Sequence, residues 1–488
     1  MIRIVLYVIL FVLSNVCAEA QGALQKAVDA FAKAPMMQSA SLSVCVLDAQ
    51  SGQQLAGFDA RKSLIPASSL KTITTASALA MLGSDYRFRT ELQYDGKLSA
   101  DGTLSGNLYI KGYGDPTLGS DQMEDTPDLE AILSSFVQAI QKEGIQRVEG
   151  HIVGDASFFE SAAAGRRWLW EDLGNYYGSG IWGLNIHENK YYLELQQQSR
   201  LGARPEIANM QPEIPNLVLI NELRSAEKGS GDNAYIFGAP WGYTRFIRGT
   251  IPVGNSLFSI KGSIPDPPFF AAHCLMRRMV KAGIAVDGYA TSLLEFLRSG
   301  QKETARKTFY THQSVALSQL IRPTNLRSIN LYCDAMLKAI GSREKGEGSS
   351  AAGLAAIAAY WQKKGLDVGG FFMDDGSGLS VRNAVSAYHL ASVLRLLSED
   401  KVLYEPFKAS LPVAAKSGTL KYMFRSTKAA GKLQAKSGGM ERVRSYTGYT
   451  INSKGKLLCF SIIANNFSGK SSLVRQAMEK LMLAIHNS

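Results

Sequence analysis

Strand-like segments lie near both ends of this chain, and they constrain the fold more than any other feature. Near the N-terminus, residues 41–50 and 53–60 alternate between apolar and polar side chains on either side of a Ser-Gly turn signal. Near the C-terminus, residues 432–466 contain a second run of strands, followed by an amphipathic helix at residues 471–488. The sequence therefore predicts an α/β (α+β) domain formed by both chain ends, with an antiparallel sheet and helices on both faces.

The block between these ends has a different character. Short alternating runs within residues 84–284 predict strands, and one clear helix at residues 126–144 interrupts them. A chain of 488 residues is also too long for one compact core. We therefore expect a discontinuous domain made of residues 21–90 and 285–488, with an inserted region at residues 91–284. The inserted region is expected to hold two smaller β-rich domains, at residues 91–114 with 200–284 and at residues 115–199.

Residues 1–20 have the features of an export signal. A short positive start precedes ten apolar residues, about half a membrane span, and a small-x-small cleavage site ends at Ala20. The mature chain is expected to begin at Gln21. Cys17 raises the alternative of a lipoprotein, although the valine before it fits that cleavage poorly. The protein is therefore expected to be exported to the periplasm and to carry no transmembrane anchor.

Charge and cysteine usage argue against several classes of function. The net charge of +11 is spread along the chain, with no basic run typical of a nucleic-acid arm, so no nucleic-acid partner is expected. It fits either a basic surface or a bias toward acidic partners such as carboxylate-bearing peptides. Neither zinc-type cysteine spacing nor an HExxH motif occurs, and no metal is expected. Cys45 and Cys459 lie in strand-like runs, so buried free thiols and a disulfide both remain open.

The first candidate for chemistry is Ser68-x-x-Lys71, which opens an apolar helix predicted over residues 68–82. Side chains three residues apart lie on one face of a helix, and the helix N-terminus favours negative charge. An apolar setting lowers the pKa of a lysine, which could make Lys71 a base for Ser68. On this segment alone, a helix-capping serine beside a solvated lysine is an equally good interpretation, and other Ser-x-x-Lys matches occur in polar contexts.

Two further short patterns follow along the chain. Ser328 and Asn330 stand at the start of an amphipathic helix, where an N-cap serine is the ordinary explanation. A Lys-Ser-Gly triplet leading into a strand occurs twice, at residues 416–418 and 436–438. The second triplet is preferred because strand-like sequence follows it. The adjacent glycines Gly438 and Gly439 would also let a substrate backbone approach the strand edge.

In this order, the three elements S-x-x-K, S-x-N and K-[ST]-G form the signature of penicillin-binding proteins and serine β-lactamases. The 260 residues between Ser68 and Ser328 are far more than a simple β-lactamase needs. With the segments "GYGDPTL", "GDASFF" and "DDGSGLS", the mature chain resembles the D-alanyl-D-alanine carboxypeptidase/endopeptidase family of the penicillin-binding protein 4 type (peptidase family S13). The resemblance implies a transpeptidase-like domain with two inserted domains.

The resemblance also implies roles for individual residues. Ser68 is expected to be the acylated nucleophile and Lys71 its general base, with Ser328 passing a proton to the leaving amine. Asn330 is expected to hold the substrate amide, and Lys436 to keep Lys71 neutral and, with Ser437, to attract the terminal carboxylate. The site is further expected to include Gly438, the backbone N–H groups of Ser68 and Gly439 as the oxyanion hole, and Asp155 meeting the side-chain amine of the peptide. The chain departs from the family pattern at Ile329, where Asp is common, and at Ser437, where Thr is common.

The function implied is that of a periplasmic serine D,D-peptidase acting on peptidoglycan stem peptides. Its substrates would end in D-Ala-D-Ala or carry D-Ala cross-links, β-lactams would acylate Ser68, and no cofactor would be needed. Two alternatives remain: a β-lactamase, for which the sequence shows no Glu-x-x-x-Asn element, and a non-catalytic peptidoglycan-binding protein on the same fold. Three intact motifs argue against the binding protein, because a pure binder has no need of the two lysines.

Overall fold

The computed structural model describes residues 22–488, so the predicted export signal, with Cys17 and the cleavage near Ala20, lies outside the described residues. The chain divides into two compact units. Unit 1 comprises the described residues up to Ser84 together with residues 317–329 and 354–488, and unit 2 comprises residues 85–316 and 330–353.

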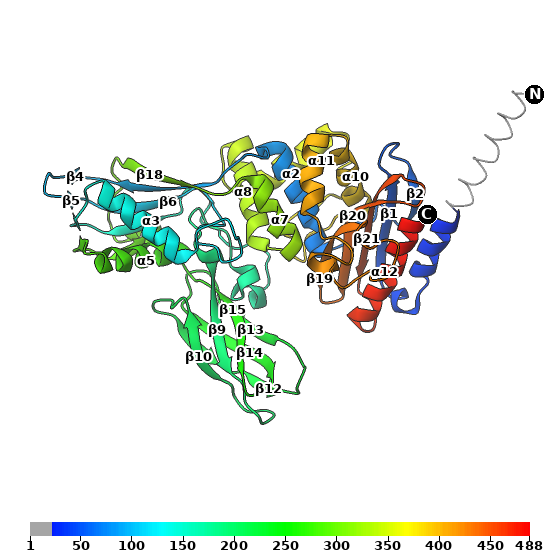
Figure 1. Cartoon of the computed structure of the whole chain (residues 1–488), viewed down its shortest axis with the longest axis horizontal. Coiled ribbons are helices and arrows are strands. Elements are labelled where there is room, and N and C mark those ends of the chain that lie inside the picture. The colour runs from blue at the N-terminus through cyan, green and yellow to red at the C-terminus, as the bar shows by residue number, and fades with distance from the viewer. Residues whose placement is uncertain (1–21) are drawn as a thin grey trace, which may run out of the picture. The chain divides into compact units, whose positions relative to one another are not determined.

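Unit 1 is built on a five-stranded antiparallel sheet in the order β19-β20-β21-β1-β2 (Figure 1). Its strands are β1 (Ser41–Asp48), β2 (Gln54–Phe58), β19 (Gln434–Met440), β20 (Val443–Ile451) and β21 (Leu457–Asn465). The N-terminal β1 pairs with β21 along its whole length, from Ser41 opposite Asn465 to Asp48 opposite Leu458. The antiparallel sheet predicted from the two chain ends is therefore confirmed.

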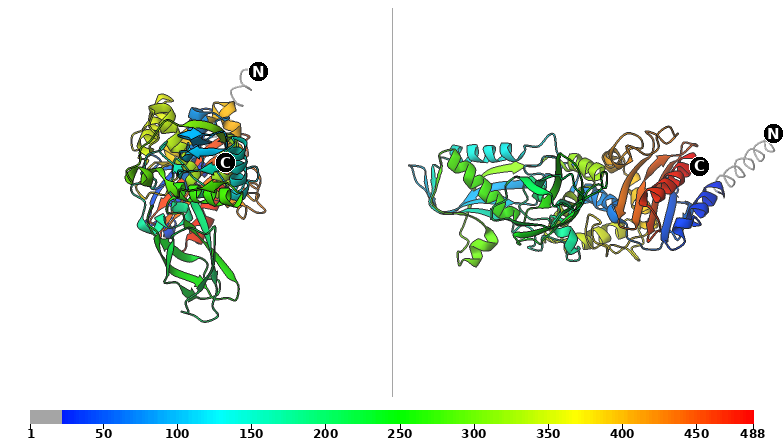
Figure 2. Two further views of the ribbon diagram at one scale, coloured as in Figure 1. Left: turned by 90° about the vertical axis from the view of Figure 1, so that its left-hand side faces the viewer. Right: turned by 90° about the horizontal axis from the view of Figure 1, so that it is seen from below.

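Helices cover both faces of this sheet. On one face, the helix at residues 22–32 lies beside α12 (Ser471–Asn487), and apolar side chains from both pack against β1, β20 and β21 (Figure 1 and Figure 2). On the other face, α10 (Ala387–Ser398) packs on β1 and β21 and contacts α2 (Lys71–Leu82). Two further helices of unit 1 contact α2 on this side, α7 (Leu317–Arg327) and α11 (Lys401–Ser410).

The helix α2 is buried on nearly its whole circumference. Every residue from Lys71 to Leu79 is buried, which is typical of a helix at the centre of a domain. Its side-chain hydroxyls bond within the protein, for example Thr75 to the carbonyl of Lys71. Ser77 accepts a hydrogen bond from the indole of Trp361, and Gly83, at a φ of 90°, ends the helix. The helix predicted at residues 68–82 is confirmed, except that its first turn, η2 (Ala67–Leu70), is a 3₁₀ turn.

Unit 2 contains four sheets in the described residues. The largest, in the order β17-β8-β6-β3-β18, is formed by β3 (Arg89–Tyr94), β6 (Leu108–Gly112), β8 (Ile152–Asp155), β17 (Ala290–Ser292) and β18 (Lys307–Gln313). A smaller sheet is formed by β4 (Lys97–Leu98), β5 (Thr103–Ser105), β7 (Arg147–Val148) and β16 (Ala285–Val286). The other two are formed by β9 (Lys190–Gln196), β10 (Glu206–Gln211) and β15 (Leu257–Ser263), and by β11 (Val218–Asn221), β12 (Arg224–Ala226), β13 (Asn233–Phe237) and β14 (Thr244–Pro252).

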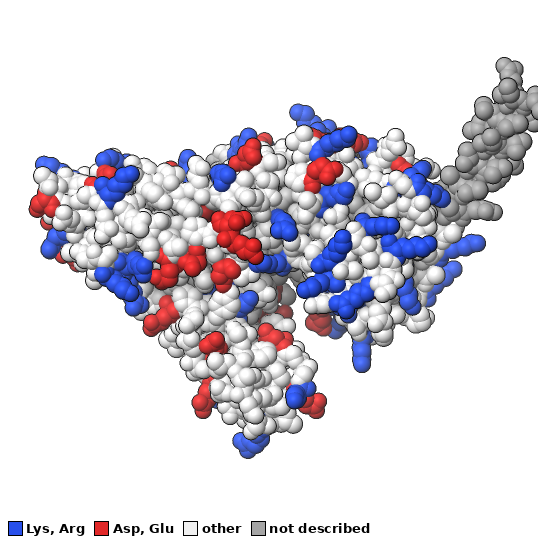
Figure 3. Space-filling model, in the orientation of Figure 1, with Lys and Arg blue, Asp and Glu red and all other residues white. Residues whose placement is uncertain are grey.

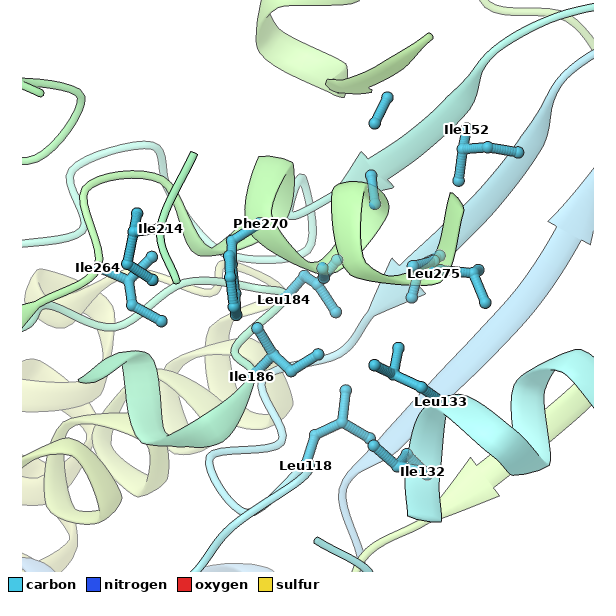
Figure 4. Packing of buried hydrophobic residues seen from close by; sticks show 14 of the residues in the cluster. Leu118, Ile132, Leu133, Ile152, Leu184, Ile186, Ile214, Ile264, Phe270 and Leu275 are labelled. Atoms are coloured by element: carbon cyan, nitrogen blue, oxygen red, sulfur yellow. The ribbon is translucent and has the colours of Figure 1, made fainter. Parts of the chain in front are cut away.

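Two amphipathic helices of unit 2, α3 (Leu129–Lys142) and α5 (Pro267–Lys281), pack on each other and supply much of its core. Figure 4 shows Ile132 and Leu133 of α3 and Phe270 and Leu275 of α5 within one cluster of buried apolar side chains. Three shorter or later helices complete the unit: α4 (Trp170–Leu173), α6 (Leu293–Arg298) and α8 (Asn330–Lys345). The helix α9 (Ser350–Lys363) begins in unit 2 and ends in unit 1.

The unit boundaries differ in part from the expected domain boundaries. The first break follows Ser84, close to the expected residue 90. Residues 285–316, expected in the catalytic domain, supply β17 and β18 to the large sheet of unit 2, where β18 pairs with β3. Local periodicity could not show this, because it carries no information about which distant strand a segment will pair with. The split of residues 91–284 into two smaller domains stays a prediction.

The two strand cysteines lie on neighbouring strands but are not bonded to each other. Cys45 stands opposite Ser461, and Cys459 stands opposite Leu47, so the two thiols are offset along the β1–β21 pair. Both are free and buried. Burial raises the pKa of Cys45 to about 12, and that of Cys459 is raised as well. Of the two alternatives that the sequence left open, the structure has the free thiols.

Candidate active site

Ser68 and Lys71 meet at the junction between η2 and α2. The Nζ atom of Lys71 donates a hydrogen bond to Ser68 Oγ at 2.9 Å and another to the backbone carbonyl of Ser377 at 2.5 Å. Lys71 is fully buried, whereas Ser68 is partly exposed. The partly exposed hydroxyl of Ser68 is therefore hydrogen-bonded to the buried amine of Lys71. This arrangement is expected of a nucleophile and its base.

The loop at residues 374–380 holds this lysine in place. The Asp375 carboxylate accepts hydrogen bonds from the backbone N–H groups of Gly378 and Ser380, at 2.7 and 2.6 Å. Folded in this way, the loop directs the carbonyl of Ser377 to Lys71 and that of Gly376 to the hydroxyl of Thr74 on α2. This loop contains the segment "DDGSGLS", for which the sequence alone indicates no role. The signal was an aspartate followed by two glycines, a common pattern for a tight loop.

Strand β19 runs against the turn that carries Ser68. A Cβ atom added at Gly438 would lie 2.6 Å from the carbonyl oxygen of Pro66 and 2.8 Å from the backbone nitrogen of Ser69. Only glycine allows this approach of the strand to the turn. The approach of a substrate backbone to Gly438 and Gly439 stays a prediction. The hydroxyl of Ser445, opposite Gly438 on β20, bonds the same Pro66 carbonyl at 2.6 Å.

Ser69, which follows Ser68 directly, faces the protein interior. It is fully buried, and its hydroxyl donates to the Pro66 carbonyl at 2.8 Å and accepts from Ser445 at 3.0 Å. Of the two adjacent serines, only Ser68 is hydrogen-bonded to Lys71. The sequence could not separate the two by residue type, and the turn geometry separates them.

A second hydroxyl–ammonium pair joins the other two motifs. Lys436, buried on β19, donates from Nζ to Ser328 Oγ at 2.9 Å and to the carbonyl of Ser437 at 2.7 Å. Ser328 follows the end of α7 with a φ of 62°, a left-handed conformation that costs a non-glycine residue about 1–2 kcal/mol. Ala67, next to Ser68, also has a positive φ, of 45°. Strained backbone of this kind concentrates at functional sites.

The hydroxyl beside this second pair has a neighbour that the sequence did not predict. Ser437 Oγ donates to Oγ1 of Thr419 at 2.8 Å, and Thr419 is exposed within the short turn η5 (Gly418–Leu420). Thr419 directly follows the upstream Lys-Ser-Gly triplet at residues 416–418. The residue that follows the upstream triplet therefore brings a hydroxyl to the downstream triplet at residues 436–438.

Asn330 and Asp155 belong to unit 2. Asn330 is the first residue of α8, and its side-chain amide donates to the carbonyl of Tyr177 at 2.9 Å. Asp155 ends β8 and is fully buried. Its carboxylate accepts from Lys111 at 3.0 Å and from Arg306 at 2.6 Å, and these bonds outweigh the effect of burial and lower its pKa. An incoming amine would have to compete with these two cations.

The geometry of unit 1 supports covalent chemistry at a carbonyl group. Ser68 is hydrogen-bonded to the buried Lys71, and Ser328 is hydrogen-bonded to the buried Lys436. The hydroxyls of Ser437 and Thr419, which bond each other, lie next to this second pair. Residues 22–488 contain no cluster of three His, Cys, Asp or Glu side chains placed to hold a metal ion. No helix within that range is long and apolar enough to cross a bilayer.

Comparison with known proteins gives a consistent family. The model of the D-Ala-D-Ala carboxypeptidase 3 (S13) family matches residues 24–485. The D-alanyl-D-alanine carboxypeptidase of Actinomadura sp. (strain R39) is 28% identical over 487 residues, which cover 96% of this chain and 87% of that protein.

Solved structures share the fold. The crystal structure of penicillin binding protein 4 (dacB) from Haemophilus influenzae has a TM-score of 0.79 at 24% identity, covering 92% of this chain and 97% of that one. A structure of the same protein complexed with a novel β-lactam has a TM-score of 0.74 at 22% identity, with the same coverage. Since the family model spans nearly all of the described residues, the chain belongs to the S13 family of D-Ala-D-Ala carboxypeptidases and is a serine carboxypeptidase.

Proposed function

We propose that the protein is a periplasmic D,D-peptidase that cleaves peptidoglycan stem peptides through an acyl-enzyme on Ser68. The observation that carries the proposal is the 2.9 Å contact between Ser68 Oγ and the buried Nζ of Lys71. Burial disfavours the charged form of an amine, so Lys71 is suited to accept the serine proton. Membership in the S13 family and the relatives named above supply the substrate class.

In the proposed reaction, Ser68 Oγ attacks the carbonyl carbon of the penultimate D-Ala while its proton passes to Lys71. The backbone N–H groups of Ser68 and Gly439 stabilise the oxyanion of the tetrahedral intermediate. Ser328 then delivers a proton to the leaving amine, and the acyl-enzyme forms as the peptide bond breaks. Water attacks the ester in a second step and restores the Ser68 hydroxyl.

Binding residues complete the proposal. Lys436 and Ser437 attract the terminal carboxylate of the peptide, and the contact between Lys436 and Ser328 brings that charge close to the proton relay. Asn330 holds the substrate amide. Asp155 meets the side-chain amine of the stem peptide in place of one of its present cations, of which Lys111 is the more exposed.

The identity of the leaving amine decides which reaction results. Release of free D-Ala makes the enzyme a carboxypeptidase, and release of an amine on a neighbouring stem makes it an endopeptidase that opens cross-links. β-Lactams, which resemble the D-Ala-D-Ala end, would acylate the same serine. The complex of the Haemophilus influenzae protein with a β-lactam supports this expectation.

Two readouts test the proposal together. The protein is incubated with benzylpenicillin while intact mass is followed over time, and D-Ala release from a pentapeptide is measured in parallel. A long-lived adduct on Ser68 with D-Ala release is expected. Rapid turnover of penicillin without D-Ala release would instead indicate a β-lactamase, and neither adduct nor product would indicate a non-catalytic binding protein.

The adjacent serines provide a matched pair of variants. Ser68→Ala should lose both the adduct and D-Ala release. Ser69→Ala removes an identical hydroxyl one residue away, which bonds only Pro66 and Ser445 among the recorded contacts, and should still form the adduct. An adduct that persists in Ser68→Ala, or disappears only in Ser69→Ala, would refute the assignment of the nucleophile.

A further inference from the structure

Unit 1 contains a second site of chemical interest, which the proposed reaction does not use. A cavity of about 630 Å³ lies between the end of α11, the loop before β19, the turn between β20 and β21, and the end of α12. Lys408, Lys428 and Lys432 line it, and its lining contains no aspartate or glutamate. We call this site the lysine cavity.

The lysines of this cavity are not neutralised by neighbouring carboxylates. Within residues 22–488, none of the three ammonium groups takes part in an ion pair. Residues 401–456 carry twelve Lys and Arg side chains but only two acidic ones, Glu405 and Glu441. Figure 3 shows Lys and Arg gathered on the face of unit 1 drawn there, around β19, β20 and α12. Unpaired cations that surround a hollow attract and concentrate anions.

A fourth lysine stands at the rim of the lysine cavity. The position that a Cβ atom would take at Gly431, which lines the cavity, is 3.0 Å from Nζ of Lys416. Lys416 belongs to the upstream Lys-Ser-Gly triplet, which the proposed reaction leaves unused. Its side chain is exposed, so its charge adds to that of the three lining lysines.

The floor of the cavity is polar but uncharged at neutral pH. Thr450 on β20 and His486 near the end of α12 share a hydrogen bond of 2.8 Å between Oγ1 and Nδ1. Burial lowers the pKa of His486, which keeps the imidazole neutral. The positive charge of the site therefore comes from the lysines. The hydroxyl and the imidazole offer hydrogen bonds to an oxygen-rich ligand.

We propose that the lysine cavity binds carboxylates of the peptidoglycan polymer at stem peptides other than the one being cleaved. This inference rests on the proposed function, which makes a carboxylate-bearing peptide polymer the substrate. Engagement of a second stem in the same unit as Ser68 would raise the effective concentration of the polymer at the reactive serine. The inference concerns binding of the polymer, so a single short peptide is expected to gain little from the cavity.

The test compares two triple variants that remove equal charge. Lys408→Gln, Lys428→Gln and Lys432→Gln are combined in one protein, and Lys33→Gln, Lys363→Gln and Lys364→Gln, all exposed in unit 1 and outside the cavity, in the other. Co-sedimentation with purified peptidoglycan sacculi is measured across NaCl concentrations. D-Ala release from a soluble pentapeptide is measured in parallel.

The cavity variant should bind sacculi about tenfold more weakly at low salt, because each unpaired surface cation contributes a modest, screened attraction. Its dependence on salt should be flatter, and its turnover of the soluble pentapeptide should stay within about twofold of the parent, because the cavity lysines take no part in the chemistry. The control variant should bind sacculi like the parent protein. Acylation by benzylpenicillin in both variants would show that they are folded.

Three results would overturn the inference: unchanged sacculus binding by the cavity variant, an equal loss in both variants, or binding to anionic phospholipid vesicles that depends on the cavity while sacculus binding does not. The last would assign the site to a membrane surface instead. Failure of the proposed function gives a different result, because the parent protein would then release no D-Ala from the pentapeptide, whatever its binding to sacculi.

Discussion

Unit 1 and unit 2 each bury two lysine side chains, but they surround them with different partners. In unit 1, Lys71 and Lys436 each donate to a serine hydroxyl and to a backbone carbonyl. In unit 2, Nζ of Lys190 forms ion pairs with the carboxylates of Asp121 and Glu188 at 2.6 and 2.8 Å. Nζ of Lys338 forms an ion pair with the Glu160 carboxylate at 3.3 Å.

We expect this difference to separate the lysines that take part in the reaction from those that hold the structure together. Burial would lower the pKa of Lys190, but the Glu188 and Asp121 carboxylates raise it, so its proton is held firmly. In unit 1, the oxygens that accept from Lys71 and Lys436 include the two serine hydroxyls expected to react. Burial lowers the pKa of Lys338 in spite of Glu160, so contact with a serine hydroxyl, rather than burial or pKa alone, distinguishes the lysines expected to react.

Net charge divides along the same boundary. The described residues of unit 1 carry 26 Lys and Arg against 11 Asp and Glu, a net charge of +15, whereas unit 2 carries 26 against 30, a net charge of −4. The positive charge of the whole chain is therefore a property of the unit that holds the serine–lysine pairs. An anionic substrate would be drawn to this unit in particular.

The same substitution in each unit provides the largest test of this comparison. Lys71→Met should slow acylation by benzylpenicillin about 10³-fold, because a positioned general base typically contributes 10²–10⁴-fold. Lys338→Met should leave acylation nearly unchanged but lower the denaturant midpoint of unit 2, because it leaves Glu160 without its lysine.

Intact-mass spectrometry of samples quenched at successive times gives the acylation rates. Circular dichroism during denaturant titration gives the unfolding midpoints. If Lys338→Met slowed acylation as much as Lys71→Met, the distinction between reactive and structural lysines would fail. A Lys71→Met protein that had merely unfolded would be recognised by its lost circular dichroism signal.

A buried carboxyl group of unit 2 predicts a pH dependence of stability. Asp266 caps α5 by accepting a hydrogen bond from the N–H of Phe269 at 3.0 Å. Burial raises its pKa from about 3.8 to about 6, against the lowering effect of that hydrogen bond. Since the folded pKa lies above the unfolded one, the contribution to stability is fully present below pH 3.8 and is lost as the pH rises to 6. Above pH 6 the ionised carboxylate costs up to about 3 kcal/mol.

Asp266→Asn keeps a cap of similar shape without a titrating proton. The variant should match the parent near pH 4 and exceed its free energy of unfolding by about 2–3 kcal/mol at pH 7. Urea unfolding followed by tryptophan fluorescence suits this test, because four of the five tryptophans lie in unit 2. Parallel pH profiles for parent and variant would count against the buried, titrating carboxyl.

The smallest expected effect concerns Thr419, whose hydroxyl accepts from Ser437 at 2.8 Å. Thr419→Val keeps the shape of the side chain and removes the hydrogen bond. It should raise KM for a pentapeptide about fivefold with little change in kcat, since one hydrogen bond contributes about 1 kcal/mol. A double-mutant cycle with Ser437→Ala would show whether the two hydroxyls act together, and fully additive effects would contradict that coupling.

Much of the fold was predictable because it depends on local patterns. Alternating segments at residues 41–50 and 432–466 predicted the strands of the unit 1 sheet, and small and apolar residues predicted α2. Sequence order also placed Ser68, Lys71, Ser328 and Lys436 in one set. Residues 285–316 were expected in the catalytic domain but supply β17 and β18 to unit 2, because strand pairing depends on long-range contacts that periodicity does not encode.

Other parts of the site could not be seen in the sequence for the same reason. The Ser377 carbonyl, which accepts from Lys71, is a backbone group and has no residue-type signature. Thr419 reaches Ser437 only through the fold of the loop between them. The hydrogen bonds that Asp155 accepts from Lys111 and Arg306 depend on strands and loops from three separate parts of unit 2.

By itself, the sequence determined the family of the protein, the order of its motifs and the expectation of a nucleophile beside a base, because these depend on residue types at fixed spacing. Only the tertiary structure decided which backbone carbonyl accepts from Lys71, which lysine meets Ser328, and which unit carries the positive charge. These properties depend on distances between segments hundreds of residues apart, and such distances are set only when the chain packs.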